Sequence, residues 1–453
     1  MDINHFEKLL FEKALKSGFS DCEIYFERDK NFSVKVFRKE LAQYQNSDTC
    51  GLTFRGIYNG KMGYSYTENI DDSIIDFLIN SAKENAELVE NSDEVFFEYD
   101  NSYPDYKEFE EIKVEENSIS AEEKINLAKE METAVYSKSD LISSVDNCNI
   151  ADGYSQTYIS NTRGLNLSSK FIYSIAVVSA RAQKNNDTKV EYEFYSGKNF
   201  NNFNPEDISK KVVDKVLSRL DSKSVKSGQY NIILKNDSMV DLLSTFVSNF
   251  YAENIMQGFS LLKNKIGEEI ANKSINIYDE VSHKNSLKEI AFDSEGVPAQ
   301  NKVIVENGVL KQYLYNLKWA KKAGINSTGN GFKSGFKSSV GTSTLNFYIE
   351  EGNKNFDDLL ASLNNGLLIT SLSGLHAGTN IISGDFSLLA DGFFIENGKI
   401  KFPVEQITIA SNFYDVLKNI SDLSNDLYFD LPGNGGSIGA PSVLINNISV
   451  SGE

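Results

Sequence analysis

The sequence predicts an α+β protein whose C-terminal part is rich in β-sheet. Three observations support this class: several segments place apolar residues at helical spacing, alternating β-type runs lie between them, and two β hairpins near the end share the turn Glu-Asn-Gly. With 453 residues, the chain is long enough for two or three domains with substantial cores. Polar stretches near residues 101–120 and 222–229 divide it into the ranges 1–110, 111–222 and 223–453.

The first range begins with an amphipathic helix that is expected to end near Gly18. Alternating β-type segments follow, and the last of them carries Asn59-Gly60 between two β-rich runs. Because Asn-Gly tolerates the positive φ angles of a type I′ turn, these two residues predict a β hairpin. A second helix is predicted over residues 73–89.

The middle range has one predicted helix over residues 121–137, followed by strands that include residues 169–183 and 189–197. A further helix is expected to begin at Asn204 and Pro205, which suit the N-cap and the first turn. The middle range is therefore predicted to end on a helix.

The third range opens with a predicted strand at residues 230–236 and continues with one long helix over residues 237–258. The two Glu-Asn-Gly hairpins span residues 303–315 and 393–405. Their shared plan predicts a sheet as the core of this range and suggests an internal duplication.

Composition excludes several function classes. The formal net charge of -19, with scattered lysines, disfavours direct nucleic-acid binding. The acidic residues near the N-terminus argue against a secretory signal, and no apolar run is long enough for a membrane span. The three cysteines, without a CxxC spacing, are typical of a reducing cytoplasm.

The densest group of polar side chains lies in the glycine-containing segment 373–392. Glycines allow close approach of a ligand to the backbone, and hydroxyl, amide and carboxylate groups could then orient it. The alternative is a tight loop whose polar side chains bond to its own backbone. The candidate residues are His376, Asn380, Ser383, Asp385 and Ser387.

A Ser-His-Asp hydrolase built from His376, Ser383 and Asp385 is disfavoured, because the GxSxG elbow is missing and nearness in sequence does not make a triad. An independent catalytic zinc is also disfavoured, because the chain has three histidines and neither HExxH nor HExxxH. The glycine-rich stretch 327–339 lacks the spacing of a phosphate-binding loop and is expected to be a flexible loop. The same holds for the glycine-rich turn that follows residue 431.

Several segments, in order, resemble the TldD/PmbA family over essentially the whole chain. The most specific are SGDFSLLADGFFIENGKIKFPVEQ, FDSEGVPAQNKVIVENG with the following STGN, and QGFSLLKNKIGEEIA. The segment GLHAGTN resembles the TldE/PmbA type. The resemblance implies a three-part fold and a cytoplasmic peptidase complex, linked in the family with peptide maturation and with modulation of DNA gyrase. In such a complex a TldD-type chain holds zinc through an HExxxH helix and a later cysteine.

Alignment on QGFSLLKNKIGEEIA places the HExxxH positions on Leu243, Ser244 and Ser248, and the later cysteine is missing from PGNGGSIGAPS. This chain is therefore expected to hold no cofactor and no catalytic residue. It would act as the non-catalytic subunit beside a TldD-type zinc peptidase, with a peptide as substrate. The alternatives are a stand-alone peptide-binding or regulatory homo-oligomer, which includes a homodimer when alone, and a metallopeptidase with unrecognised ligands.

Overall fold

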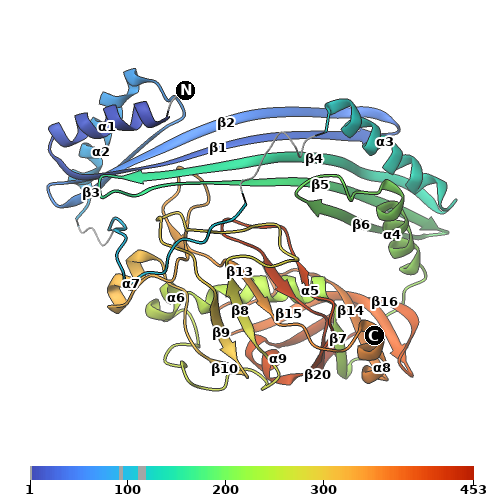
Figure 1. The fold of residues 1–453 in the computed structure, drawn as a ribbon. Coiled ribbons are helices and arrows are strands. Elements are labelled where there is room, and N and C mark those ends of the chain that lie inside the picture. Colours follow the sequence, from blue (N-terminus) through green and yellow to red (C-terminus); the bar gives the residue numbers. More distant parts are fainter. Residues whose placement is uncertain (1–2, 91–94, 111–118) are drawn as a thin grey trace.

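In the computed structural model, residues 3–90, 95–110 and 119–453 are described. A long arched sheet lies above a compact C-terminal part that contains two further large sheets and a small one (Figure 1). The mixture of helices and sheets confirms the predicted α+β class. Eight of the predicted domain-boundary residues, 111–118, lie outside the described part of the chain.

The arched sheet is antiparallel and has the strand order β3-β2-β1-β4-β5-β6. Its central strands β1 and β4 pair over thirteen residues, from Glu23 with Asn161 to Lys35 with Asn149. Strands from the predicted ranges 1–110 and 111–222 thus share one sheet, and the position of that boundary stays a prediction. The strands are β1 Phe19–Phe37, β2 Glu40–Tyr58, β3 Lys61–Thr67, β4 Ile142–Asn161, β5 Asn166–Lys184 and β6 Asp187–Gly197.

Four helices cover one face of this sheet, two at each end (Figure 1). At one end they pack on Ile24 of β1, and at the other end they pack on Val34 and Val36. Side chains of a strand alternate between faces, so the odd-numbered residues of β1 face the C-terminal part. The helices are α1 Ile3–Lys16, α2 Ile75–Leu88 with the 3-10 turn Asp72–Ile74 before it, α3 Ala121–Ser137 and α4 Pro205–Ser218.

Local sequence signals mark the starts of two of these helices. Ser120 and Glu123 form a capping box at the start of α3, and the Asn204 side chain accepts a hydrogen bond from the Glu206 N–H at the start of α4. Leu15 of the amphipathic first helix is 44% exposed. It lies in the last turn of α1, beyond the buried side of that helix.

The C-terminal part contains two six-stranded sheets and a small two-stranded one, β11 Gly331–Phe332 with β12 Gly341–Thr342. One large sheet has the order β10-β9-β8-β13-β19-β18, with bounds Val309–Leu310, Lys302–Glu306, Ile277–Glu280, Asn346–Ile349, Ile438–Ala440 and Tyr428–Phe429. The other has the order β16-β15-β14-β7-β20-β17, with bounds Lys399–Asn412, Asp385–Glu396, Gly366–Ser373, Gly228–Leu234, Val443–Ser451 and Ile420–Leu423. An extra β16–β20 pairing joins strands from opposite sides of the second sheet.

Both Glu-Asn-Gly hairpins are confirmed, because Asn307-Gly308 and Asn397-Gly398 turn with positive φ angles. They lie in different sheets, β9–β10 in one and β15–β16 in the other. The predicted hairpin at Asn59-Gly60 is likewise confirmed, between β2 and β3.

The prediction of one continuous helix over residues 237–258 is wrong. The segment is divided into α5 Asn236–Phe246, a 3-10 turn Val247–Phe250 and α6 Ala252–Gln257. Asn249 accounts for part of this break, since its buried side-chain amide bonds to the Phe246 and Ile381 carbonyls. The remaining helices are α7 Leu317–Ala323, α8 Phe356–Leu363 and α9 Phe413–Asn419. None of the helices in the described ranges is both long and apolar enough to cross a membrane.

Candidate functional site

The predicted segment His376–Ser387 lies at the surface and comprises most of the connection from β14 to β15 and the first residues of β15, which begins at Asp385. His376, Asn380, Asp385 and Ser387 are exposed, and Ser383 is half-buried. The structure therefore places His376, Asn380 and Ser383 on the connection and Asp385 and Ser387 at the start of β15, where all five are accessible to a partner or a ligand.

Much of the loop's polar chemistry is directed at the loop itself. The Asn380 side-chain oxygen accepts hydrogen bonds from the N–H groups of Ile382 and Ser383, at 3.1 and 3.2 Å. The Asp385 carboxylate accepts from Asn412 at 2.9 Å and from the Ser383 hydroxyl at 2.7 Å, and these bonds hold its pKa below the usual value. The loop is thus preorganised by its own side chains.

The same contacts argue against a Ser-His-Asp triad. A triad needs the histidine between serine and aspartate, whereas here Ser383 bonds directly to Asp385. Within the described residues no hydrogen bond joins His376 to Ser383. This arrangement provides no base that could activate the serine.

The positions that align with HExxxH do not fit a zinc ion. Leu243 is fully buried in the main C-terminal core, whereas Ser244 is exposed to solvent. Ser248 lies beyond the end of α5, in the 3-10 turn. These side chains offer neither the imidazole ligands nor the carboxylate base of a catalytic zinc. Across residues 3–90, 95–110 and 119–453, no three His, Cys, Asp or Glu side chains converge to hold a metal.

A polar cleft of about 340 Å³ lies between the arched sheet and the C-terminal part. One wall is the open face of β1, β4 and β5, on which residues of neighbouring strands stand in rows. Glu27, Thr157 and Ser169 form one row, because Glu27 pairs with Thr157 and Thr157 pairs with Ser169. The next row consists of Asp29, Ser155 and Phe171. Small hydroxyl groups thus occupy strand positions where a buried sheet face would carry apolar side chains.

The opposite wall comes from three loops of the C-terminal part that are far apart in sequence. They are residues 288–294, residues 332–335 and Gly433 with Asn434. The last two belong to the glycine-rich stretches that the sequence indicated only as loops. Because glycine has no side chain to cover the backbone, these loops can present N–H and C=O groups to a ligand in the cleft.

Charged side chains of both signs line the cleft: the acids Glu27, Asp29, Glu289 and Asp293 and the lysines Lys288 and Lys333. Lys288 donates to the Asn434 carbonyl at 3.3 Å, and burial lowers the pKa of its amine to about 8. Burial also raises the pKa of Glu27, although the Tyr25 hydroxyl donates to its carboxylate at 2.8 Å. A cleft whose charged groups have both signs, beside rows of small hydroxyl groups, suits a ligand that is recognised through its backbone.

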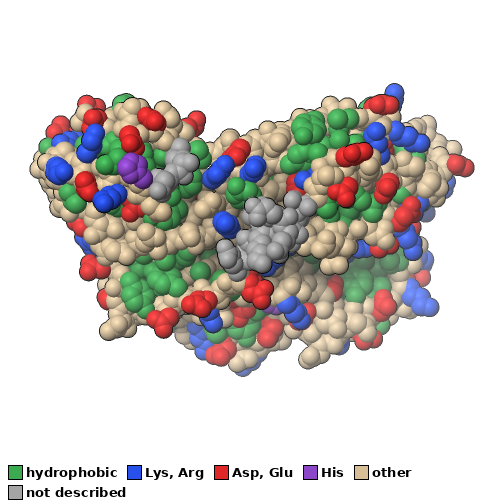
Figure 2. Space-filling view, turned by 45° about the horizontal axis from the view of Figure 1, so that its top comes forward, with side chains coloured by type: hydrophobic (Ala, Val, Ile, Leu, Met, Phe, Trp, Pro, Cys, Tyr) green, Lys and Arg blue, Asp and Glu red, His purple; other side chains and the backbone are tan. Residues whose placement is uncertain are grey.

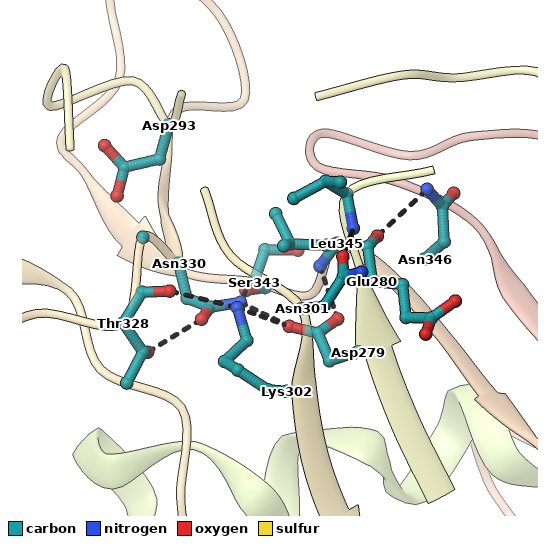
Figure 3. Close-up of polar contacts among 12 residues, drawn as sticks. Asp279, Glu280, Asp293, Asn301, Lys302, Thr328, Asn330, Ser343, Leu345 and Asn346 are labelled. Atoms are coloured by element: carbon teal, nitrogen blue, oxygen red, sulfur yellow. Dashed lines mark hydrogen bonds and ion pairs between the residues drawn. The ribbon is translucent and has the colours of Figure 1, made fainter. Parts of the chain in front are cut away.

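A buried charged network holds Asn330, two residues before the cleft-lining Phe332 (Figure 3). The Lys302 ammonium lies 3.1 Å from the Asp279 carboxylate and donates to the Thr328 carbonyl at 2.9 Å. The other donors to Asp279 are the Asn330 side chain, at 2.9 Å, and the Leu345 N–H, at 2.7 Å. The network joins β8, β9 and the STGN segment into one rigid unit.

The segment FDSEG is fixed in a similar way next to the cleft. The Asp293 carboxylate accepts three backbone N–H groups, those of Glu295, Val297 and Gly331, at 2.8–3.0 Å. Glu295 accepts the Leu317 N–H at 2.8 Å, at the start of α7. Burial raises the pKa of both carboxyl groups. These acids hold loops in place, which explains their occurrence without a metal role.

The molecular surface carries interspersed acidic and basic side chains. On the face shown in Figure 2 the Lys and Arg side chains lie among Asp and Glu side chains, without a continuous basic field. Such a surface offers no obvious track for a phosphate backbone, in keeping with the net charge of -19.

Sequence reasoning missed the cleft as a site. Its residues come from three strands and three loops, so their convergence depends on tertiary structure. The available signal was the set of hydroxyl residues at alternate positions of two strands, Ser155 and Thr157 in one and Ser169 in the other. The glycine-rich stretches were a second signal.

Family models match the chain in three consecutive parts. They describe domain 1, the central domain and the C-terminal domain of the PmbA/TldA metallopeptidases, over residues 22–86, 115–220 and 227–452. A protein of Methanocaldococcus jannaschii is 30% identical over 415 residues, which are 90% of this chain and 92% of that protein. A Haemophilus influenzae protein, named as a homolog of the metalloprotease PmbA, is 25% identical over 98% of this chain and 94% of its own length.

Two solved structures are similar to the whole molecule. A Thermotoga maritima protein, named as a candidate modulator of a DNA gyrase, has a TM-score of 0.89 and 31% identity, covering 99% of this chain and 100% of that one. TldE from Thermococcus kodakarensis has a TM-score of 0.90 at 23% identity, covering 99% and 100%, and shows the same fold.

Proposed function

Because the chain belongs to the PmbA/TldD metallopeptidase family, we propose that it is the TldE/PmbA-type, non-catalytic subunit of a cytoplasmic zinc peptidase. A TldD-type partner would supply the zinc and the catalytic carboxylate. The observation that carries this proposal is the helix α5, where Leu243 packs into the core at the position of a zinc-binding histidine. Without an ionisable ligand there, this chain cannot lower the pKa of a zinc-bound water.

Within this proposal the two candidate sites have different roles. The interdomain cleft would hold part of an extended or unfolded peptide, whose backbone could bond to the hydroxyl rows and to the glycine loops. The exposed loop around His376, Asn380, Ser383 and Asp385, with Ser387, would face the TldD-type partner or the entering peptide.

The direct test measures zinc content and cleavage of an unfolded peptide, for this chain alone, for a TldD-type chain alone and for the mixture. We expect stoichiometric zinc and cleavage in the mixture, and neither with this chain alone. Binding of the peptide without any gain of cleavage in the mixture would instead favour the stand-alone peptide-binding protein. Zinc and cleavage by this chain alone would contradict the proposal and favour a metallopeptidase with other ligands.

A second experiment separates the two sites. Ser155→Trp places a large ring in the cleft and is expected to weaken peptide binding at least about tenfold, by steric exclusion, while pairing with the TldD-type chain persists. Gln156→Trp is the matched control, because neighbouring strand residues point to opposite faces. Alanine at His376, Asn380, Ser383 and Asp385 should reduce pairing or cleavage without unfolding the chain. Unchanged pairing and cleavage in this fourfold variant would remove the loop from the proposal.

A further inference from the structure

Four of the six charged side chains that line the polar cleft have partners within the chain. The Glu289 carboxylate lies 3.2 Å from the Lys198 ammonium. Asp293 accepts three backbone N–H groups, and the positive charge of Lys333 favours the ionised form of Glu27. These four groups therefore contribute to holding the walls of the cleft together.

The other two charged side chains, Asp29 and Lys288, are not neutralised. In the described part of the chain neither of them forms an ion pair. The Lys288 ammonium has three donor hydrogens, and its one hydrogen bond within that part goes to the neutral Asn434 carbonyl, at 3.3 Å. Burial lowers the pKa of this amine to about 8, so it is still mainly charged at pH 7. The cleft thus keeps one carboxylate and one ammonium available to a ligand.

The two groups lie at opposite ends of one row of side chains. Asp29 on β1 pairs with Ser155 on β4, and Ser155 pairs with Phe171 on β5. The Lys288 ammonium lies over the Phe171 ring, 5.7 Å from its centroid. Neighbouring strands are about 4.8 Å apart, so about 10 Å separate β1 from β5. At this separation the two charges cannot pair with each other, and the Ser155 hydroxyl lies between them.

We propose that the cleft binds a short peptide of two or three residues with both ends free, its terminal ammonium at Asp29 and its terminal carboxylate at Lys288. An extended chain advances about 3.3–3.6 Å per residue, so the two ends of such a peptide lie about 7–10 Å apart. The inference rests on the proposed function and names the class of peptide, a released fragment with two charged ends.

Other ligands use less of what the cleft offers. The backbone of an internal stretch of a long peptide is uncharged and would leave both Asp29 and Lys288 without a partner. A single amino acid is too short, because its ammonium and its carboxylate are attached to one carbon atom. The cleft volume of about 340 Å³ is near the lower end of the range of about 300–1,000 Å³ for small-ligand sites. Both charge separation and size therefore favour a short peptide.

The test is isothermal titration calorimetry of the full chain with trialanine, N-acetyl-trialanine, trialanine amide and free alanine. We expect trialanine to bind at least about tenfold more tightly than each of the other three, since each of them loses a charged contact or cannot span the row. These comparisons need no variant, so they do not depend on the folding of a mutant.

Variants assign each end of the peptide to one residue. Lys288→Met should lose the preference for a free carboxylate and keep the preference for a free ammonium, and Asp29→Asn should do the reverse. A general disturbance of the cleft would instead weaken all the peptides equally. Lys30→Met is the matched control, because Lys30 is exposed beside Asp29 on the opposite face of the sheet and should keep both preferences.

The outcomes separate this inference from the proposed function. Equal affinities for trialanine and its blocked forms, or preferences that survive in both variants, would overturn the inference. If a longer unfolded peptide with blocked ends then bound to the chain and Ser155→Trp weakened it, the proposed function would stand. No binding of any peptide, by this chain alone or with a TldD-type chain, would overturn the inference together with the proposed role of the cleft.

Discussion

Asp279→Ala is expected to lower the free energy of unfolding by about 3–5 kcal/mol, the cost found when one partner of a buried ion pair is removed. Asp279 is fully buried, and its partner Lys302 is 5% exposed. The substitution would remove the ion-pair partner of the buried Lys302 ammonium, which would keep its hydrogen bond to the Thr328 carbonyl. It would also remove the acceptor of the Leu345 N–H and of the Asn330 amide.

Chemical denaturation, followed by fluorescence of the single tryptophan Trp319, measures this change, because Trp319 lies on α7 in the same part of the molecule. The matched control is Glu268→Ala, which breaks the exposed pair with Lys265 and should cost less than about 1 kcal/mol. In the double variant Asp279→Leu with Lys302→Met, the loss should be smaller than in Asp279→Ala, since no buried charge is left alone. Equal losses for Asp279→Ala and Glu268→Ala would show that the buried network does not stabilise the cleft wall.

Local chemistry decided which elements could be predicted from the sequence. The hairpins at Asn59-Gly60, Asn307-Gly308 and Asn397-Gly398 were predictable, because asparagine and glycine accept the positive φ angles that these turns require. The helix that begins at Asn204 was predictable because an N-cap side chain accepts a hydrogen bond from the first turn of the helix. The residues that determine these elements lie within a few positions of one another in the sequence.

The β1–β2 hairpin shows why other elements were missed. It turns at Arg38 and Lys39, both with positive φ angles, which are uncommon for such residues. The turn is stabilised from a distance of more than ninety residues, because the fully buried carboxylate of Glu132 on α3 accepts the N–H groups of Arg38 and Lys39, at 2.7 and 2.6 Å. A tertiary contact supplies what the local sequence lacks, so the sequence analysis predicted no turn at Arg38 and Lys39.

The two candidate sites also differ in whether local sequence determines them. The loop that holds His376 and Asp385 is contiguous in sequence, and its clustering was therefore visible. The cleft depends on the register of three strands, which brings Glu27, Thr157 and Ser169 into one row. Register is set by the whole sheet rather than by any single strand, so this row could not be derived from the sequence pattern.

Grafting the HExxxH pattern onto α5, with Leu243→His, Ser244→Glu and Ser248→His, is expected to destabilise the chain without creating a zinc site. Leu243 is fully buried in the main core, so the imidazole would replace apolar packing and would lack a hydrogen-bond partner there. The expected loss is about 2–5 kcal/mol, as for large-to-small changes of a buried leucine. The two histidines would also lie on different elements, because α5 ends at Phe246 and Ser248 belongs to the following turn.

The control is the pair Ser244→Glu with Ser248→His, which leaves Leu243 in place and should change the free energy of unfolding by less than about 1 kcal/mol. Zinc content by elemental analysis and denaturation curves, measured on both variants, separate the two effects. Stoichiometric zinc in a triple variant of wild-type stability would show that α5 can turn this position toward a metal. The absence of zinc ligands in this chain would then depend on these three side chains alone. The expected result, lost stability without zinc, would show that the packing of α5 itself excludes a zinc site at this position, which would support the proposed non-catalytic role.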